Sequence, residues 1–260
     1  MRFFKRRIHK AVSDLDTVEI SEQNGIRYLH LGNDTVQSAM RLSAPNALEL
    51  TYTQAMLGFL LFTDTPSNAM QIGLGGGSLT KFLYHRFPAM QLNAVEINPK
   101  VIQAAHQFFF VPDDDERLHI TQADAAEFIV DQDGWDCILL DGFDAGLQVE
   151  ALASADFYSR CANALTPTGV LSVNLWGSGP KFEIYLQRLT EAFDQRILCL
   201  PAEKRGNVII FGFATQPPIQ ANRLLLHRAQ QLETKLDLPF IDFLERLKHT
   251  SGNENFFTIK

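Results

Sequence analysis

Two carboxylates spaced three residues apart, Asp141 and Asp144, form the segment of this chain best suited to chemistry on an amine. They follow the continuously apolar run 137–140, so the sequence places them at the end of a buried strand. A carboxylate can bind and orient a protonated amine, and can accept the proton as the neutral nitrogen attacks an electrophilic carbon. We therefore predict Asp141 to be a general base and Asp144 a second amine contact. The alternative for Asp144 is a turn-initiating role beside Gly142 and Gly146.

A glycine-dense turn formed by Gly73, Gly75 and Gly77 lies between an apolar strand and a helix. Glycines at such a turn let the backbone approach a nucleoside closely. The Gly-x-Gly-x-Gly spacing fits S-adenosylmethionine (AdoMet), whereas a dinucleotide-binding turn has glycine where Ser78 stands. A phosphate-binding loop requires a Gly-Lys-Ser/Thr triplet, which does not follow here. The remaining alternative is that the glycines only form a tight turn.

Two further acidic strand ends favour a nucleoside site. Glu96 closes the next strand, 20 positions after Gly76, where a carboxylate can accept the ribose hydroxyls. Asp124, followed by Ala125, closes the third strand, where its side chain can accept from an adenine amine. Asp124 also precedes a helix and can cap it, and the two roles can coexist. Since ligands of open α/β sheets bind outside the carboxyl ends of the strands, we predict an AdoMet-like ligand rather than NAD.

The elements that position these residues alternate between strands and helices, which predicts a parallel sheet with helices on both faces. We expect strands at 69–73, 91–97, 117–121, 136–141 and 169–175, and helices at 78–87, 99–109, 124–131, 153–165, 179–194, 219–236 and 239–248. Two more strands, 196–200 and 208–214, have no helix between them and should pair antiparallel at one edge. This is the seven-stranded, Rossmann-like arrangement of the class I AdoMet-dependent transferases.

The chain before this alternation predicts a small β-rich segment. Asn24-Gly25 lies between two alternating runs and predicts a hairpin over 17–33. We expect a short surface tail before it, an irregular stretch over 34–50 and a helix over about 52–62. The fold class is therefore α/β, with residues 1–66 as an N-terminal hairpin-and-helix segment and 67–260 as the nucleoside-binding domain.

The charge and composition of the chain argue against several classes of protein. The formal net charge of -7 argues against a nucleic-acid binder, and the longest apolar run, 55–62, is too short to span a bilayer. The three cysteines are far apart in apolar surroundings, which indicates free thiols in a reducing compartment. No histidine or acidic cluster has a metal-ligand spacing, so we predict no metal. We expect a cytoplasmic protein that acts on a small molecule.

This constellation resembles the spermidine synthase (polyamine aminopropyltransferase) family over about residues 15 to 215. The likeness includes the hairpin, the glycine turn, the segment 95–99, the Asp124-Ala125 pair and the Asp-x-x-Asp segment 141–144. The resemblance implies decarboxylated AdoMet as co-substrate, a polyamine acceptor and methylthioadenosine as by-product. It also implies that Asp141 is the base, that Gln37 contacts the nucleoside, and that the protein is a homodimer or homotetramer.

The chain departs from the family pattern on the amine side of the site. Gly76 stands where the family has an aspartate that holds the donor ammonium. In the stretch 51–56 the family glutamate is missing, which leaves Tyr52 and Gln54 as substrate-binding candidates. The segment 201–207, with Lys204 and Arg205, replaces a family Tyr-Pro-Ser-Gly. Two alternatives therefore stay open: an AdoMet-dependent methyltransferase and a non-catalytic nucleoside-binding protein.

Overall fold

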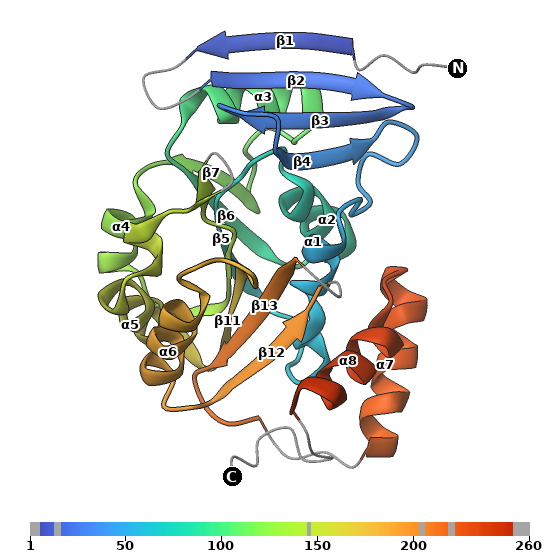
Figure 1. Ribbon diagram of the computed structural model, residues 1–260. Helices are drawn as coiled ribbons and strands as arrows, with labels where there is room; N and C mark the ends of the chain where they lie inside the picture. The colour runs from blue at the N-terminus through green and yellow to red at the C-terminus, as the bar shows by residue number, and fades with distance from the viewer. Residues whose placement is uncertain (1–5, 13–16, 145–146, 203–205, 218–221, 252–260) are drawn as a thin grey trace.

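A seven-stranded sheet forms the centre of the protein (Figure 1), which we describe from a computed structural model. The structure describes residues 6–12, 17–144, 147–202, 206–217 and 222–251. The strand order is β12-β13-β11-β8-β5-β6-β7. These strands are β5 (Asn68–Ile72), β6 (Gln91–Glu96), β7 (Leu118–Gln122), β8 (Trp135–Leu140), β11 (Leu165–Trp176), β12 (Ile197–Pro201) and β13 (Asn207–Phe213).

The pairing confirms the predicted topology. β5 pairs parallel with β6 and β8, and β6–β7 and β8–β11 are also parallel pairs. β13 is antiparallel to both β11 and β12, so β12 and β13 form the expected antiparallel pair at one edge. Since β8 and β11 are buried on both faces, their central residues 137–140 and 170–173 are apolar apart from Ser172.

Helices cover both faces of this sheet, as the alternating pattern predicts. α4, α5 and α6 pack on one face, whereas α1, η1, α2, α7 and α8 pack on the other (Figure 1). Their bounds are α1 (Thr51–Ala55), η1 (Gly58–Leu61), α2 (Ser78–Arg86), α3 (Pro99–Phe109), α4 (Ala125–Phe128), η2 (Ile129–Asp131), η3 (Glu150–Ala153), α5 (Ala155–Ala164), α6 (Phe182–Ala192), α7 (Asn222–Leu236) and α8 (Phe240–Ser251). Within the described ranges, no helix is long and apolar enough to cross a bilayer.

A second, antiparallel sheet lies across the amino-terminal side of the molecule, in the order β1-β2-β3-β4 (Figure 1). Its strands are β1 (Arg6–Val12), β2 (Thr17–Gln23), β3 (Ile26–Leu31) and β4 (Val36–Arg41). The predicted hairpin is β2–β3, and its turn residues Asn24 and Gly25 have φ of 54° and 74°, as the favoured two-residue turn requires. The sheet packs on α3 through apolar side chains that include Ile20, Met40 and Phe109.

Four details of the prediction were wrong. The expected tail contains β1, and the expected irregular stretch contains β4. The alternation of β4 is hidden because its first half carries Gln37 and Ser38, which line the cavity described below. The expected helix over 52–62 is divided into α1 and the 3₁₀ helix η1, and the helix over 124–131 is divided into α4 and η2. The three cysteines are free thiols as predicted, although Cys199 is only half-buried.

A buried lysine links α2 to β4 and to the end of α3. Lys81 of α2 is fully buried, and its Nζ donates to the carbonyl of Phe109 at 2.6 Å and lies 3.0 Å from Met40 Sδ. Burial lowers the pKa of Lys81 from 10.5 to about 8. The ammonium therefore caps the carboxyl end of α3 at the cost of its own hydration.

This lysine predicts a stability that rises with pH. Between about pH 8 and pH 10.5 the unfolded chain binds more protons at this position than the folded chain does, so stability increases across that window. We expect a gain of about 3 kcal/mol in the free energy of unfolding, which Lys81→Met should abolish. Urea denaturation across this pH range measures the effect, with the exposed Lys235→Met as control. Parallel profiles for the wild type and Lys81→Met would contradict it.

Candidate active site

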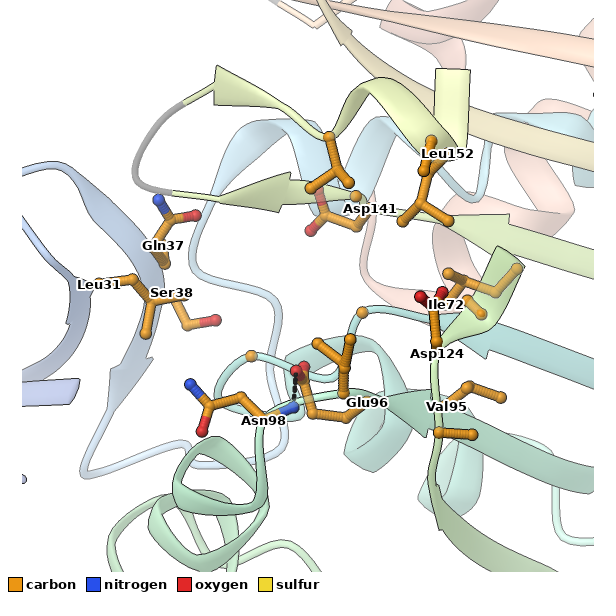
Figure 2. Close-up of a pocket in the computed structure, with 18 residues that line it drawn as sticks. Leu31, Gln37, Ser38, Ile72, Val95, Glu96, Asn98, Asp124, Asp141 and Leu152 are labelled. Atoms are coloured by element: carbon orange, nitrogen blue, oxygen red, sulfur yellow. Dashed lines mark hydrogen bonds between the residues drawn. The ribbon is translucent and has the colours of Figure 1, made fainter. Parts of the chain in front are cut away.

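The carboxyl ends of β5, β6, β7 and β8 meet at one cavity of about 250 Å³ (Figure 2). β4 of the second sheet and the segment 149–152 complete its wall. The lining residues are Leu31, Gln37, Ser38, Ile72, Gly73, Gly75, Val95, Glu96, Ile97, Asn98, Ala123, Asp124, Ala125, Asp141, Gly142, Val149, Ala151 and Leu152. The sequence-predicted nucleoside residues are therefore brought together here, apart from Gly77, which does not line the cavity.

The glycine turn is required by the packing of the protein itself. Gly73, Gly75 and Gly77 have φ of 87°, 53° and 64°, a backbone region that favours glycine. A Cβ at Gly73 would lie 2.3 Å from the carbonyl oxygen of Asp141. A Cβ at Gly77 would lie 2.2 Å from Val111. The close approach of Gly73 to Asp141 joins the nucleoside turn directly to the predicted base.

Glu96 is held by the backbone of the neighbouring turns. One carboxylate oxygen accepts from the backbone N–H of Leu74 at 3.0 Å. The other accepts from the backbone N–H of Asn98, also at 3.0 Å (Figure 2). Burial raises the pKa of Glu96, and these N–H groups oppose the rise. The backbone N–H groups of Gly75 and Ile97 also bond to this carboxylate, and Glu96 lines the cavity, so a ligand hydroxyl there would meet a fully oriented acceptor.

Asp124 is an N-cap and also faces the cavity. Its Oδ1 accepts from the backbone N–H of Ala126 at 2.8 Å, which caps α4. Asp124 and Ala125 both line the cavity, so the capping role leaves Asp124 Oδ2 at the cavity wall (Figure 2). Asp124 therefore caps α4, as considered from the sequence, and also lies where it could accept from an adenine amine.

Asp141 is the centre of a hydrogen-bonded chain of side chains. Its Oδ2 accepts from the Tyr52 hydroxyl at 3.0 Å, and its Oδ1 accepts from Asn174 Nδ2 at 2.8 Å. Asn174 Oδ1 in turn accepts from Asn207 Nδ2 at 2.8 Å. These contacts fix the orientation of the carboxylate, because both of its oxygens are engaged by side chains that are themselves packed against the sheet.

The surroundings of Asp141 suit proton transfer. Burial raises the pKa of this carboxyl, while the hydrogen bonds from Asn174 and Tyr52 oppose the rise. The pKa of Tyr52 is raised by its own burial and by the neighbouring Asp141 charge, so the phenol stays protonated and donates. A carboxylate with a raised pKa is a stronger base towards an amine than a solvated one.

A second cavity, of about 370 Å³, lies beside Asp141. Gln37 and Asp141 line both cavities. The other lining residues of the second cavity are Thr35, Val36, Tyr52, Asn174, Trp176 and Asn207. Two ligands placed in these cavities would therefore meet at Asp141.

Gln37 has a buried donor without a protein partner. Its Nε2 finds no hydrogen-bond acceptor among the described residues, whereas its backbone carbonyl lies 3.2 Å from the Tyr52 hydroxyl. An unsatisfied buried amide costs about 1–3 kcal/mol, which a ligand oxygen in either cavity would recover. This orphaned donor fits the expected contact between Gln37 and a nucleoside.

The wall segment 149–152 is anchored to α6 by Glu150. The Glu150 carboxylate accepts from Lys181 Nζ at 2.6 Å, from the Tyr185 hydroxyl at 2.9 Å and from Arg188 at 3.3 Å. These donors lower the pKa of Glu150 to about 2. Since Val149, Ala151 and Leu152 line the first cavity, this cluster fixes the wall opposite the glycine turn.

Two predicted substrate residues are not placed in the site. Gln54 donates from Nε2 to the carbonyl of Leu48 at 2.7 Å and lines neither cavity, so the structure gives its predicted role no support. Asp144 lies in β9 (Phe143–Asp144), which pairs with β10 (Leu147–Gln148). Its side chain lies outside the described part of the chain, so its role stays a prediction.

Comparison with known proteins decides the family. The family model of the spermine/spermidine synthase domain matches residues 49–191. A polyamine aminopropyltransferase of Chromobacterium violaceum is 42% identical, over 96% of this chain and 97% of the relative. The chain belongs to the spermine/spermidine synthase family.

Solved structures agree with the fold. A probable spermidine synthase from Corynebacterium glutamicum matches with a TM-score of 0.74 at 17% identity, over 86% of each chain. Human methyltransferase-like protein 13 in complex with SAH matches with a TM-score of 0.65 at 27% identity, over 73% of this chain and 93% of that one. Both the resemblance and the class I fold inferred from the sequence are therefore confirmed.

In this member of the spermine/spermidine synthase family, Gly76 occupies a crowded position. Its backbone N–H donates to Ser38 Oγ at 2.8 Å. A Cβ at residue 76 would lie 2.9 Å from both Phe109 Cδ1 and Ser38 Cβ. An aspartate therefore does not fit here unless β4 or α3 shifts, which links the departure at residue 76 to the identities of Ser38 and Phe109.

Several residues that line the two cavities were not predicted from the sequence. Ser38 and Asn174 are buried polar residues in strands, and Asn174 interrupts the apolar run of β11, which is a signal that the sequence contained. Trp176 and Asn207 carried no such signal. They come together only because β11 and β13 pair, with Trp176 opposite Asn207 in the register.

Proposed function

We propose that this chain is a polyamine aminopropyltransferase that moves an aminopropyl group from decarboxylated AdoMet to an amine acceptor and releases methylthioadenosine. The family and the full-length similarity to the Chromobacterium violaceum relative support this activity. The observation that carries it is the position of Asp141, which lines both cavities and is hydrogen bonded by Tyr52 and Asn174.

The first cavity takes the nucleoside of the donor. Glu96 accepts the ribose hydroxyls, Asp124 accepts the adenine amine, and the Gln37 amide donates to a ligand oxygen. The turn at Gly73 and Gly75 lets the donor sulfur lie close to Asp141, because no side chain intervenes.

The second cavity takes the acceptor amine. Asp141 binds the amine and receives a proton as the nitrogen attacks the donor carbon. The new C–N bond forms while the C–S bond breaks, and the bonding electron pair passes to sulfur, which becomes the neutral thioether of methylthioadenosine. The Tyr52 and Asn174 hydrogen bonds keep the carboxylate directed at the nitrogen.

A methyltransferase is the second candidate. Gly76 favours it, because residue 76 itself supplies no carboxylate to attract the ammonium of an aminopropyl group. The similarity to a human methyltransferase-like protein also covers 73% of this chain. The methyltransferase is disfavoured because the chain is more similar to an aminopropyltransferase, at 42% identity over 96% of its length.

Binding and turnover with both donors test the proposal. Calorimetry with decarboxylated AdoMet, AdoMet and methylthioadenosine should give the tightest binding for the decarboxylated donor or the thioether product. Incubation of the decarboxylated donor with putrescine should release methylthioadenosine, detected by chromatography. Preference for intact AdoMet, with no methylthioadenosine released, would replace the proposal by the methyltransferase. The predicted homodimer or homotetramer and the boundary at residue 66 stay predictions.

A further inference from the structure

Asn207 is a polar side chain that lies two hydrogen bonds away from the predicted base. Its Nδ2 donates to Asn174 Oδ1 at 2.8 Å, and Asn174 Nδ2 donates to Asp141 Oδ1, also at 2.8 Å. Asn174 is buried, whereas Asn207 is half-buried at the wall of the second cavity. The three side chains therefore form a row that begins at the cavity wall and ends on the carboxylate.

The antiparallel pairing of β11 with β13 brings Asn207 to this position. Asn174 lies opposite Ile209, and Trp176 lies opposite Asn207, so the two asparagines are diagonal neighbours. Residues two apart on a strand share one face of the sheet, and diagonal neighbours lie about 7–8 Å apart, which two amide side chains together can bridge. β13 thus reaches Asp141 through one intervening side chain.

The direction of these hydrogen bonds follows from the chemistry of the groups. An ionised carboxylate only accepts hydrogen bonds, so Asn174 must turn its NH₂ group to Asp141. The carbonyl oxygen of Asn174 then faces Asn207, which must present a donor, and its own NH₂ group is that donor. Each amide therefore has one orientation that satisfies both contacts.

A flip of the Asn174 amide would reverse its effect on the base. Its oxygen would then face the Asp141 carboxylate, so that a hydrogen bond to the charged form is replaced by repulsion between two acceptors. In the present orientation this hydrogen bond opposes the effect of burial on the pKa of Asp141. Asn207 disfavours the flip from the other side, because two NH₂ groups would then face each other.

The titratable groups around Asp141 stay the same when residue 207 is changed. Among the described residues, those that contact Asp141 or share its first cavity are Tyr52 of α1, Glu96 at the end of β6 and Asp124 before α4. The side chain of Asp144 lies outside the described part of the chain, and its effect on Asp141 is common to all variants at residue 207. A difference in the titration of Asp141 between such variants therefore reports on residue 207.

We infer that Asn207 is a positioning residue for the base: it holds the Asn174 amide in the orientation that keeps the Asp141 carboxylate charged and fixed between the two cavities. The inference rests on the proposed function, which it extends from the base to the residue that orients its partner. It also gives the antiparallel strand β13 a part in the reaction, through the direction of a single amide.

Asn207→Leu tests this inference, because leucine has nearly the size of asparagine and no donor. The pKa of Asp141 should rise, with an acid dissociation constant about threefold to tenfold smaller than in the wild type. NMR titration of isotope-labelled aspartate carboxyls measures it, and the resonance is assigned by its loss in Asp141→Asn. The acid limb of kcat/KM should move to higher pH with it, so activity should fall about threefold to tenfold below that limb and less than about twofold above it.

Three further variants separate orientation from structural damage. Asn207→Ala makes the same test with a smaller side chain, and should raise the pKa of Asp141 as leucine does. Asn207→Gln keeps an amide donor and should recover most of the wild-type titration. Asn68→Leu is the matched control, because it removes the hydrogen bond from Asn68 Nδ2 to the Gly134 carbonyl at the opposite end of the parallel strands.

The outcomes separate this inference from the proposed function. An unchanged titration of Asp141 in Asn207→Leu and Asn207→Ala would overturn the role of Asn207 and leave the transferase intact. A loss of turnover without a move of the acid limb would also overturn it, because that result indicates a structural role alone. If the wild type releases no methylthioadenosine with any amine, the proposed function fails. The carboxyl titration needs no turnover, so it still decides whether Asn207 controls the charge on Asp141.

Discussion

Asp141→Asn should lower kcat by about 10²- to 10⁴-fold, the range typical for loss of a positioned general base. The amide keeps the size of the carboxylate but cannot accept the proton of the attacking amine. It also faces Asn174 Nδ2 and the Tyr52 hydroxyl, which both donate, so one of these contacts is lost. Methylthioadenosine affinity, measured by calorimetry, should change by less than about fivefold, because the proposed nucleoside contacts are Glu96, Asp124 and Gln37 rather than Asp141.

The pH dependence of kcat/KM gives a second test of the role of Asp141. Burial raises the pKa of Asp141, so the carboxyl gains its proton at a higher pH than a solvated aspartate. The acid limb of kcat/KM should therefore lie above the usual aspartate range, and activity should be lost as pH falls through it. A raised pKa also means that the ionised carboxylate destabilises the fold at neutral pH.

The exposed Asp131→Asn in η2 is the matched control, since it removes an equal charge away from the cavities. Full turnover by Asp141→Asn would show that Asp141 is not the general base. A variant that binds methylthioadenosine as before but does not turn over would exclude the non-catalytic alternative.

Glu96→Gln should weaken binding of the donor and of methylthioadenosine by about 100-fold. Two ribose hydroxyls lose a charged acceptor, and hydrogen bonds to charged groups contribute about 1.5–3 kcal/mol each. The new amide NH₂ also faces one of the two backbone N–H groups, of Leu74 or Asn98, that the carboxylate accepts from. This unpaired donor should cost a further 1–3 kcal/mol or so in the free energy of unfolding.

Calorimetry with methylthioadenosine measures the affinity, and urea denaturation measures the stability. Glu127→Gln, an exposed change on α4, serves as the control. Saturating donor should restore most of kcat, because Glu96 lies away from the reacting nitrogen. Unchanged affinity would show that the ribose is bound elsewhere.

The sequence was sufficient to predict the site residues whose positions follow from local chain geometry. The glycine turn, Glu96 and Asp124 each end or follow a strand, and strand ends of a parallel sheet meet at one edge. The turn at Asn24-Gly25 was likewise predictable, because few residues adopt its backbone conformation. These features depend on neighbours in the chain, which a single sequence displays.

Site residues that are brought together by long-range strand pairing could not be predicted from the sequence. Asn207 and Trp176 face each other through the register of β11 and β13, which no local pattern specifies. Gln54 is a different case: its position in a family motif suggested a substrate contact, but its amide donates to the carbonyl of Leu48, so that role stays a prediction. β4 was missed because a strand that serves a cavity carries polar residues where a core strand carries apolar ones.

Because β4 contributes to the cavity, nucleoside binding should also stabilise the contact between the two sheets. Gln37 and Ser38 belong to the antiparallel sheet, while Glu96 and Asp124 belong to the parallel one, so the cavity exists only when the two layers are in register. Any ligand that bridges them acts as a non-covalent cross-link between the layers. By mass action, a donor at 100 times its Kd would add about 2.7 kcal/mol against their separation. The cellular supply of the donor would thus set the resistance of the amino-terminal layer to local unfolding, as well as the rate of the reaction.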